Sequence, residues 1–200
     1  LGSRQKPERA GVYRLKLQGP VSVPIGSWVD IPEAACAGYT IRNSYFHDHR
    51  ARGLRLQASN GLVENCRFER IKQNAITIGS EYGFWREAGW VNNVTLQGNT
   101  ISEVCQDYLS TSPACYAPGA IATFVRLEAG AKKELYAGHS ELTIANNVIK
   151  GSRTAGIYLQ AVNGVVVTGN QIQEVGHEPI SLGQACRDVR EADNRVAEIE

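Results

Sequence analysis

Ile144-Ala-Asn-Asn-Val-Ile149 is the clearest copy of a pattern that recurs along this chain: apolar, any residue, Asn or Gly, an Asn-like residue, any residue, apolar. The further copies are Ile41-Arg-Asn-Ser-Tyr-Phe46, Val63-Glu-Asn-Cys-Arg-Phe68, Leu96-Gln-Gly-Asn-Thr-Ile101, Val167-Thr-Gly-Asn-Gln-Ile172 and Glu191-Ala-Asp-Asn-Arg-Val196. Their fourth positions are Ser44, Cys66, Asn99, Asn147, Asn170 and Asn194, at steps of 22, 33, 48, 23 and 24 residues. Three steps have nearly one length and the other two are longer, which indicates a repeat with insertions.

A second short segment follows each of the first five copies, and it alternates between apolar and other residues. These segments are Gly53–Gln57, Ala75–Gly79, Ala120–Phe124, Gly156–Gln160 and Pro179–Gly183. Alternation with a period of two places one side chain inside and the next outside. We therefore expect two strands per repeat, with these residues inside: Leu54, Leu56, Ile76, Ile78, Ile157, Leu159, Ile180 and Leu182.

The repeat predicts an all-β fold, a right-handed parallel β-helix of about six coils. A unit of two short strands cannot bury its apolar face alone, but stacked units form continuous columns. Right-handed crossovers are the rule between parallel strands. Asn tolerates the left-handed backbone conformation of a turn, and its amide can bond to the Asn of the next coil. A β-sandwich is the alternative, but its strands do not repeat one residue type in phase.

The repeat also predicts how the chain divides. We expect residues 1–10 to be disordered or derived from cloning, 11–38 to form short strands outside the repeat, and 39–200 to form the β-helix. The chain has no Met and starts with Leu1-Gly2-Ser3, so we expect it to be a piece of a longer protein.

Composition narrows the function classes. Apolar residues make up 42% of the chain, which is enough for a buried core. Lys and Arg number 21 against 20 Asp and Glu, so nothing indicates a nucleic-acid partner. No stretch is long and apolar enough to span a bilayer, and we predict no membrane partner. The oligomeric state is not predicted.

The sequence contains no recognisable motif for binding a metal ion or a cofactor. The five cysteines form no Cys-x-x-Cys pair, and Cys105 and Cys115 are interpreted either as a loop-closing disulfide or as reduced thiols. His47-Asp48-His49 offers too few ligands for a metal and is interpreted as a solvated turn. No phosphate loop or dinucleotide fingerprint occurs, so we predict no cofactor.

Two further stretches are Asn43-Ser-Tyr-Phe-His-Asp-His-Arg-Ala-Arg-Gly-Leu54 and Phe84-Trp-Arg-Glu-Ala-Gly-Trp-Val-Asn-Asn-Val-Thr-Leu96. Both resemble coils of glycoside hydrolase family 110, the α-galactosidases. The resemblance implies a secreted or periplasmic bacterial enzyme that cuts α-linked galactose from glycans with inversion. It also implies that residues 11–32 are the remnant of an inserted β-barrel. The family's paired-Asp coil has no counterpart here. Either those acids lie upstream of this chain, or the activity is absent, and whether the chain is itself an enzyme stays open.

The outward positions of the second segments give the candidate site. They form a predicted column of Arg55, Thr77, Ala122, Tyr158 and Ser181, beside Gln57, Gly79, Phe124 and Gln160. Guanidinium, phenol and amide groups can bond sugar hydroxyls. The insertion at 80–90 adds carboxylates beside indoles, and glycoside hydrolysis uses two carboxyl groups. We predict Glu81 and Glu87 as catalytic residues and, as sugar-binding residues, Arg52, Arg55, Gln57, Trp85, Tyr158 and Gln160.

Plainer interpretations of these residues stay open. The column can be an ordinary solvated sheet face. Trp85 and Trp90 can anchor the insertion on the helix, with Glu87 paired to Arg86 or Arg52. The function that the sequence favours is a glycoside hydrolase acting on galactose-containing oligo- or polysaccharides. The alternatives are a non-catalytic glycan-binding β-helix and a polysaccharide lyase or epimerase, in which Arg52, Arg55 and Tyr158 would act on a uronate.

Overall fold

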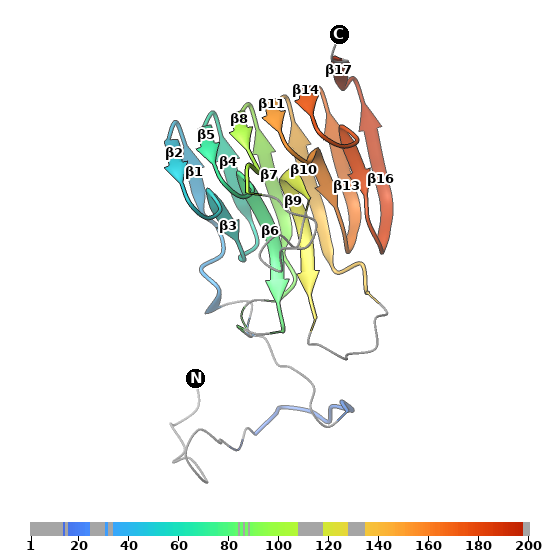
Figure 1. Ribbon diagram of the computed structural model, residues 1–200. Helices are drawn as coiled ribbons and strands as arrows, with labels where there is room; N and C mark the ends of the chain where they lie inside the picture. Colours follow the sequence, from blue (N-terminus) through green and yellow to red (C-terminus); the bar gives the residue numbers. More distant parts are fainter. Residues whose placement is uncertain are drawn as a thin grey trace.

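The computed structural model describes residues 14, 16–24, 31, 34–83, 85, 87, 89–107, 118–127 and 135–197. Within these residues the chain forms seventeen strands in three parallel sheets and no α-helix (Figure 1). Within the described residues the chain visits the three sheets in turn, with one strand of each sheet in the first five coils and strands of the first two sheets alone in the sixth. The predicted right-handed parallel β-helix is therefore confirmed.

The first sheet contains β1 (Thr40–Arg42), β4 (Gly61–Glu64), β7 (Asn92–Gln97), β10 (His139–Ala145), β13 (Val162–Thr168) and β16 (Cys186–Ala192). The second contains β2 (Tyr45–His49), β5 (Arg67–Ile71), β8 (Thr100–Val104), β11 (Val148–Ser152), β14 (Gln171–Val175) and β17 (Arg195–Ala197). The third contains β3 (Leu54–Leu56), β6 (Ile76–Glu81), β9 (Gly119–Arg126), β12 (Ala155–Leu159) and β15 (Ile180–Leu182).

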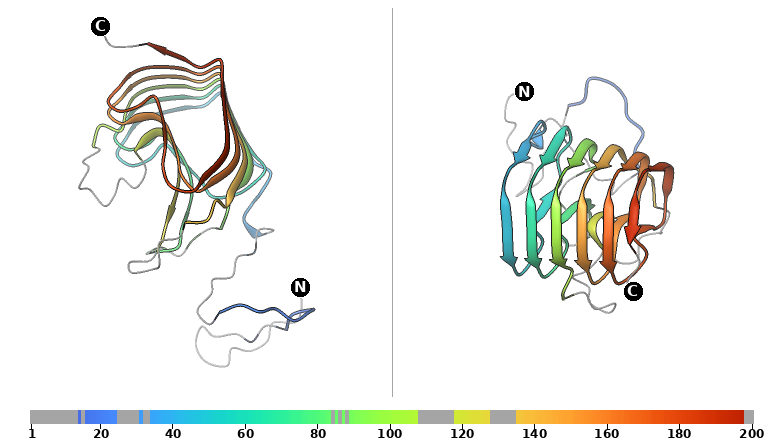
Figure 2. Two further views of the ribbon diagram at one scale, coloured as in Figure 1. Left: turned by 90° about the vertical axis from the view of Figure 1, so that its right-hand side faces the viewer. Right: turned by 90° about the horizontal axis from the view of Figure 1, so that it is seen from above.

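Stacking is in register, as the repeat predicts. Val63 of β4 lies beside Leu96 of β7, and Leu96 lies beside Ile144 of β10. Ile144 in turn lies beside Val167 of β13. Seen along the axis of the helix, the coils lie over one another, and seen from above, the strands of a sheet lie side by side (Figure 2). Equivalent side chains of successive coils therefore form files along one axis.

Each coil has three strands, where the sequence pattern predicted two. The recurring pattern spans two of them: Ile144 belongs to β10 and Ile149 to β11, with the turn between them. Reading the pattern as one strand was wrong because its two apolar ends both face inward across a sharp bend. The third strand is the alternating segment that the sequence analysis identified.

The turn between the first and second sheets divides two roles between neighbouring residues. The third position of the pattern takes the left-handed conformation, at Asn43 (φ 52°), Asn65 (51°), Gly98 (63°), Asn146 (55°), Gly169 (65°) and Asp193 (55°). Asn, Asp and Gly are the residues that adopt this conformation at least cost. The sequence analysis had assigned both the backbone role and the amide role to the fourth position.

The fourth position instead carries a chain of buried amides. Asn99 Nδ2 donates to Asn147 Oδ1 at 2.9 Å, Asn147 Nδ2 to Asn170 Oδ1 at 3.0 Å, and Asn170 Nδ2 to Asn194 Oδ1 at 2.9 Å. Each Oδ1 also accepts the backbone N–H of the fourth residue one coil back, as Asn147 does from Asn99 at 3.0 Å. These hydrogen bonds join four coils at one corner.

The core fills the interior between the three sheets. Ile76, Ile78, Ile157 and Leu159 are fully buried, as their predicted inward positions require. Leu182 was also expected inside, but it is 52% exposed. It lies on β15, which is an edge strand of the third sheet, so only β12 covers it within the described residues.

The predicted division of the N-terminal part of the chain stays a prediction. The first strand begins at Thr40, and the described residues between 11 and 38 contain no strand, while the rest of that stretch and residues 1–10 lie outside the described residues. The origin of this stretch in an inserted barrel stays a prediction. Among the described residues, no helix has the length and apolar character needed to cross a bilayer.

Candidate functional site

The predicted outward column lies on the outer face of the third sheet. Arg55 pairs in register with Thr77, Thr77 with Ala122, Ala122 with Tyr158, and Tyr158 with Ser181. Gly79 and Phe124 are paired in the neighbouring column. The repeat therefore places these side chains of five coils on one surface, which we call the third-sheet face.

The middle of this face is covered, so it is not the solvated surface that the plainer interpretation describes. Thr77 and Ala122 have no exposed area, and Phe124 is 1% exposed. The guanidinium of Arg55 lies over the Phe124 ring, 5.7 Å from its centroid. The ring also occupies the space that a side chain at Gly79 would need.

Arg55 connects the face to the insertion. With the amide of Gln57 oriented so that its oxygen faces the guanidinium, this oxygen accepts from Arg55 Nε at 3.1 Å and Nη2 at 3.2 Å. Arg55 Nη2 also lies 3.5 Å from Glu87 Oε1. Glu87 was considered as a partner of Arg86 or Arg52; the described contacts pair it with Arg55. The predicted residues Arg55, Gln57 and Glu87 thus form one cluster.

Tyr158 and Gln160 form the other half of the face. Gln160 Nε2 donates to the Tyr158 hydroxyl at 3.5 Å, and Gln160 Oε1 accepts from the backbone N–H of Val125 at 3.2 Å. The Tyr158 hydroxyl lies directly over Gly183, where a Cβ would overlap it. A glycine at 183 therefore makes room for the phenol.

The two predicted acids are neighbours but differ in environment. Their backbones pair antiparallel, with Glu81 N–H donating to Glu87 O at 3.1 Å and Glu87 N–H to Glu81 O at 2.9 Å. Such a pair places both side chains on the same side of the ribbon. The Glu81 side chain is fully buried, 3.2 Å from Arg126 Nη1, whereas that of Glu87 is 48% exposed. Of the two carboxylates, Glu87 is the one that a ligand can reach directly.

The two tryptophans of the insertion behave differently. Trp90 packs edge-on against His139 at 5.1 Å and against Tyr136 at 5.9 Å, and it covers Gly138. It anchors the insertion, as the plainer interpretation expects. Trp85 is 62% exposed, so most of its indole is open to a ligand.

Arg52 lies beside the face rather than on it. It occupies the turn between β2 and β3, where its backbone carbonyl bonds to Nδ1 of His49 at 2.7 Å. The predicted role of Arg52 in sugar binding stays a prediction.

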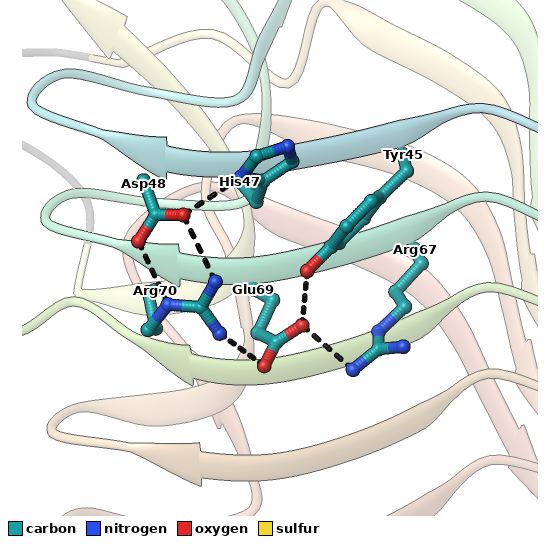
Figure 3. Close-up of polar contacts among 6 residues, drawn as sticks. All are labelled: Tyr45, His47, Asp48, Arg67, Glu69 and Arg70. Atoms are coloured by element: carbon teal, nitrogen blue, oxygen red, sulfur yellow. Dashed lines mark hydrogen bonds and ion pairs between the residues drawn. The ribbon is translucent and has the colours of Figure 1, made fainter.

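A polar cluster on the second sheet was missed in the sequence analysis. Figure 3 shows how β2 and β5 bring together Tyr45, His47, Asp48, Arg67, Glu69 and Arg70. Arg70 donates to both carboxylate oxygens of Asp48, from Nε at 2.7 Å and Nη2 at 2.9 Å. Tyr45 donates to Glu69, whose carboxylate also lies 2.6 Å from Arg67 Nη2.

Hydrogen bonds favour the ionised form of the two carboxylates in this cluster. The pKa of Asp48 lies well below its ordinary value because Arg70, and then His47, donate to it. The pKa of Glu69 is lowered chiefly by the hydrogen bond from the Tyr45 hydroxyl. The signal was present in the sequence, because Asp48 and Arg70 are 22 residues apart, which is one coil. The interpretation of His47-Asp48-His49 as a solvated turn is wrong: the three residues lie in β2, where Asp48 is ion-paired to Arg70 of β5.

Other predicted features give little further support for chemistry. In the described part of the chain, no three His, Cys, Asp or Glu side chains gather as a metal site. Cys105 is buried and its thiol donates to Gly119 O at 3.5 Å, which agrees with the interpretation as a reduced thiol. Cys115 lies outside the described residues, so the alternative, a disulfide between Cys105 and Cys115, is not tested.

Comparisons with known proteins agree with the resemblance drawn from the sequence. No protein-family model matches the chain. The chain is 24% identical over 196 residues to Alpha-1,3-galactosidase B of Bacteroides thetaiotaomicron, a member of glycoside hydrolase family 110. The match covers 84% of this chain but 29% of that protein, so the chain spans less than a third of the length of the relative it matches.

Proposed function

We propose that this chain is the carbohydrate-binding β-helix of a bacterial glycoside hydrolase acting on galactose-containing glycans outside the cytoplasm, and that the glycan lies on the third-sheet face. The observation that carries the proposal is the cluster of Arg55, Gln57 and Glu87 beside Tyr158 and Gln160 on one in-register face. The similarity of the chain to an α-1,3-galactosidase supports the proposed substrate class.

The face offers the groups that sugar recognition needs. Arg55 supplies N–H donors, Glu87 supplies acceptors, and the Tyr158 hydroxyl and Gln160 amide supply both. The exposed Trp85 adds a flat apolar ring for the less polar side of a pyranose. Because Arg55 is held by Gln57 and Glu87, little side-chain entropy is lost when a hydroxyl binds it.

Hydrolysis needs two carboxyl groups, roughly 5–10 Å apart, on either side of the scissile bond. Glu87 is the accessible candidate, either as general base or as a group that binds a hydroxyl. Two alternatives follow for its partner. One is Glu81, which would first have to exchange Arg126 for substrate. The other is a carboxylate outside this chain, as the missing paired-Asp coil implies.

A non-catalytic glycan-binding protein is the second candidate function. It is favoured by one observation: both predicted acids are already ion-paired, Glu81 with Arg126 and Glu87 with Arg55. A carboxylate held in this way binds hydroxyls without any need to transfer a proton.

The test measures galactose release from an α-1,3-linked galactosyl disaccharide, together with the dissociation constant for that disaccharide. The variants are Glu87→Gln and, as a matched control, Glu141→Gln, an exposed acid on the first sheet. The hydrolase proposal expects turnover that Glu87→Gln abolishes and Glu141→Gln leaves unchanged.

Each other result has a defined meaning. Binding without turnover in the unchanged chain refutes Glu81 as the catalytic partner of Glu87; it agrees with the glycan-binding alternative and with a partner carboxylate outside this chain. An unsaturated product from pectin or alginate, detected by its ultraviolet absorbance, supports a lyase. No binding of any galactoside refutes the assignment of the face.

A further inference from the structure

A second concave site lies at the C-terminal ends of β2, β5 and β8 and at the turns that follow them. These strand ends and turns surround an open hollow of about 520 Å³, within the usual range for small-ligand sites. Its lining comes from three successive coils: Asp48 and Arg50, then Arg70 and Lys72, then Glu103 and Gln106, with His49 beside them. The hollow belongs to the end of the second sheet, so it is distinct from the third-sheet face.

The backbone builds this lining in register. Asp48, Arg70 and Glu103 all have a φ of 52°, the left-handed conformation. They fall between paired residues: His47 lies beside Glu69 and Glu69 beside Ser102 on one side, and His49 beside Ile71 and Ile71 beside Val104 on the other. The same bulge therefore recurs in three coils. It places the acidic Asp48, the basic Arg70 and the acidic Glu103 in one row along the axis of the helix.

Several of these side chains are held before any ligand binds. Arg70 is fixed by both oxygens of Asp48 and by Glu69. Gln106 Nε2 donates to Val104 O at 3.2 Å and to Gly151 O at 3.4 Å. Within the described residues these bonds use the amide nitrogen of Gln106 and leave its Oε1 as an acceptor for a ligand. Arg50 is exposed at the rim, where its guanidinium adds hydrogen-bond donors.

The balance of charge decides what kind of ligand fits. The lining of the hollow and the charged groups that bond directly to it contain four cations, Arg50, Arg70, Lys72 and Arg153, and four carboxylates, Asp48, Glu69, Glu103 and Asp107. Lys72 Nζ lies 3.7 Å from Asp107 Oδ1, and Arg67 and Arg70 both pair with Glu69. An anion or a cation would gain no net attraction here. A neutral ligand rich in hydroxyl groups finds donors and acceptors on neighbouring side chains.

We propose that this hollow is a second sugar-binding site, selective for a neutral monosaccharide unit over a uronate or sulfated one. The proposal rests on the glycan class of the proposed function, but it concerns different residues. Arg50 and Lys72 donate to the hydroxyls of the sugar, and Gln106 Oε1 and Glu103 accept from them.

The experiment titrates the chain with galactose, galacturonate and galactose 6-sulfate, and follows backbone amide shifts by NMR. We expect galactose to shift residues 48–50, 70–72 and 103–106 and to bind more tightly there than either anion. Arg50→Ala and Gln106→Ala each remove a hydrogen-bonding group and are expected to weaken this binding about tenfold. Arg42→Ala, an exposed arginine on the first sheet, is the matched control and is expected to change nothing.

The outcomes separate this inference from the proposed function. One outcome is that galactose shifts only the amides of residues 55, 57, 158 and 160, with no effect of Arg50→Ala or Gln106→Ala. That result refutes sugar binding in the hollow, and the assignment of the third-sheet face stands. If galactose shifts the residues of the hollow in Glu87→Gln as well, and neither binding nor hydrolysis occurs at the third-sheet face, the second sugar site is supported. The proposed function of the third-sheet face is then refuted. Tighter binding of galacturonate than of galactose in the hollow overturns its selectivity for neutral sugars.

Discussion

Replacing Asn147 by leucine tests the buried amide chain directly. Asn147 has no exposed area and makes hydrogen bonds in both directions along the axis. Its Oδ1 accepts from the backbone N–H and the Nδ2 of Asn99, at 3.0 and 2.9 Å. Its Nδ2 donates to Leu96 O and to Asn170 Oδ1, both at 3.0 Å. Leucine has a similar size, so the change removes these bonds with little change in packing volume.

The magnitude follows from which groups lose their only partner. Asn170 Oδ1 still accepts from the backbone N–H of Asn147, and Asn99 Nδ2 still donates to Val63 O. The backbone N–H of Asn99 loses its acceptor in a site that water does not reach. One buried unsatisfied donor costs about 1–3 kcal/mol, so we expect Asn147→Leu to lower the free energy of unfolding by that amount.

Urea denaturation followed by circular dichroism measures this loss, and thermal melting checks it, at about 2–4 °C per kcal/mol for a chain of this size. Asn194→Leu is the matched control. It has the same motif position and the same partners on one side, but the residue is only half-buried, so water can replace the amide. We expect a smaller loss for Asn194→Leu. An unchanged unfolding free energy for Asn147→Leu, or equal losses for both variants, would refute the account of the turn.

Three further predictions concern other parts of the molecule. Gly183→Ala places a Cβ against the Tyr158 hydroxyl, and we expect galactoside binding to weaken several-fold in calorimetry with little change in melting; unchanged affinity would show that the phenol does not contact the sugar. Glu81→Gln removes the carboxylate that faces Arg126, and because Arg126 is partly exposed we expect a loss of about 1–2 kcal/mol in urea denaturation rather than the larger cost of a fully buried pair. Burial lowers the pKa of His139 to about 4, so between that value and the ordinary 6.5 the unfolded chain binds the additional proton. Stability from this group is complete above pH 6.5 and is lost as the pH falls toward 4, by about 3 kcal/mol in all. We expect the unfolding free energy of His139→Gln to fall less steeply over that interval, and parallel curves for the two proteins would contradict the assignment.

The fold was predictable because one signal is repeated many times. Ile144, Val167 and Leu96 each occupy the same position of the pattern, and parallel stacking in register is the arrangement that brings them together. The number of strands per coil was not predictable from this signal. Both flanks of the Asn turn are apolar, and a short apolar segment looks the same whether it runs straight or bends at its middle.

The candidate site was predictable in its location but not in its contacts. Alternation places Arg55 and Tyr158 on one face, since register alone determines that. The pairing of Glu87 with Arg55 depends on how residues after β6 return antiparallel to Glu81, and no periodic signal specifies such a return. The burial of Glu81 beside Arg126 has the same origin, because β6 and β9 extend further than the other strands of their sheet.

The unequal coil lengths have a consequence for how specificity can change. Asn99 and Asn147 are 48 residues apart and Asn147 and Asn170 only 23, yet both pairs hydrogen-bond with the same geometry. Backbone pairing to the preceding coil, and not the length of the connecting segment, fixes where each new coil begins. Connecting segments of this helix can therefore lengthen, shorten or exchange between related proteins without displacing Arg55, Tyr158 or the charged cluster at Arg70. Residues that contact a ligand can therefore change in the connecting segments, while those on the sheets keep their positions.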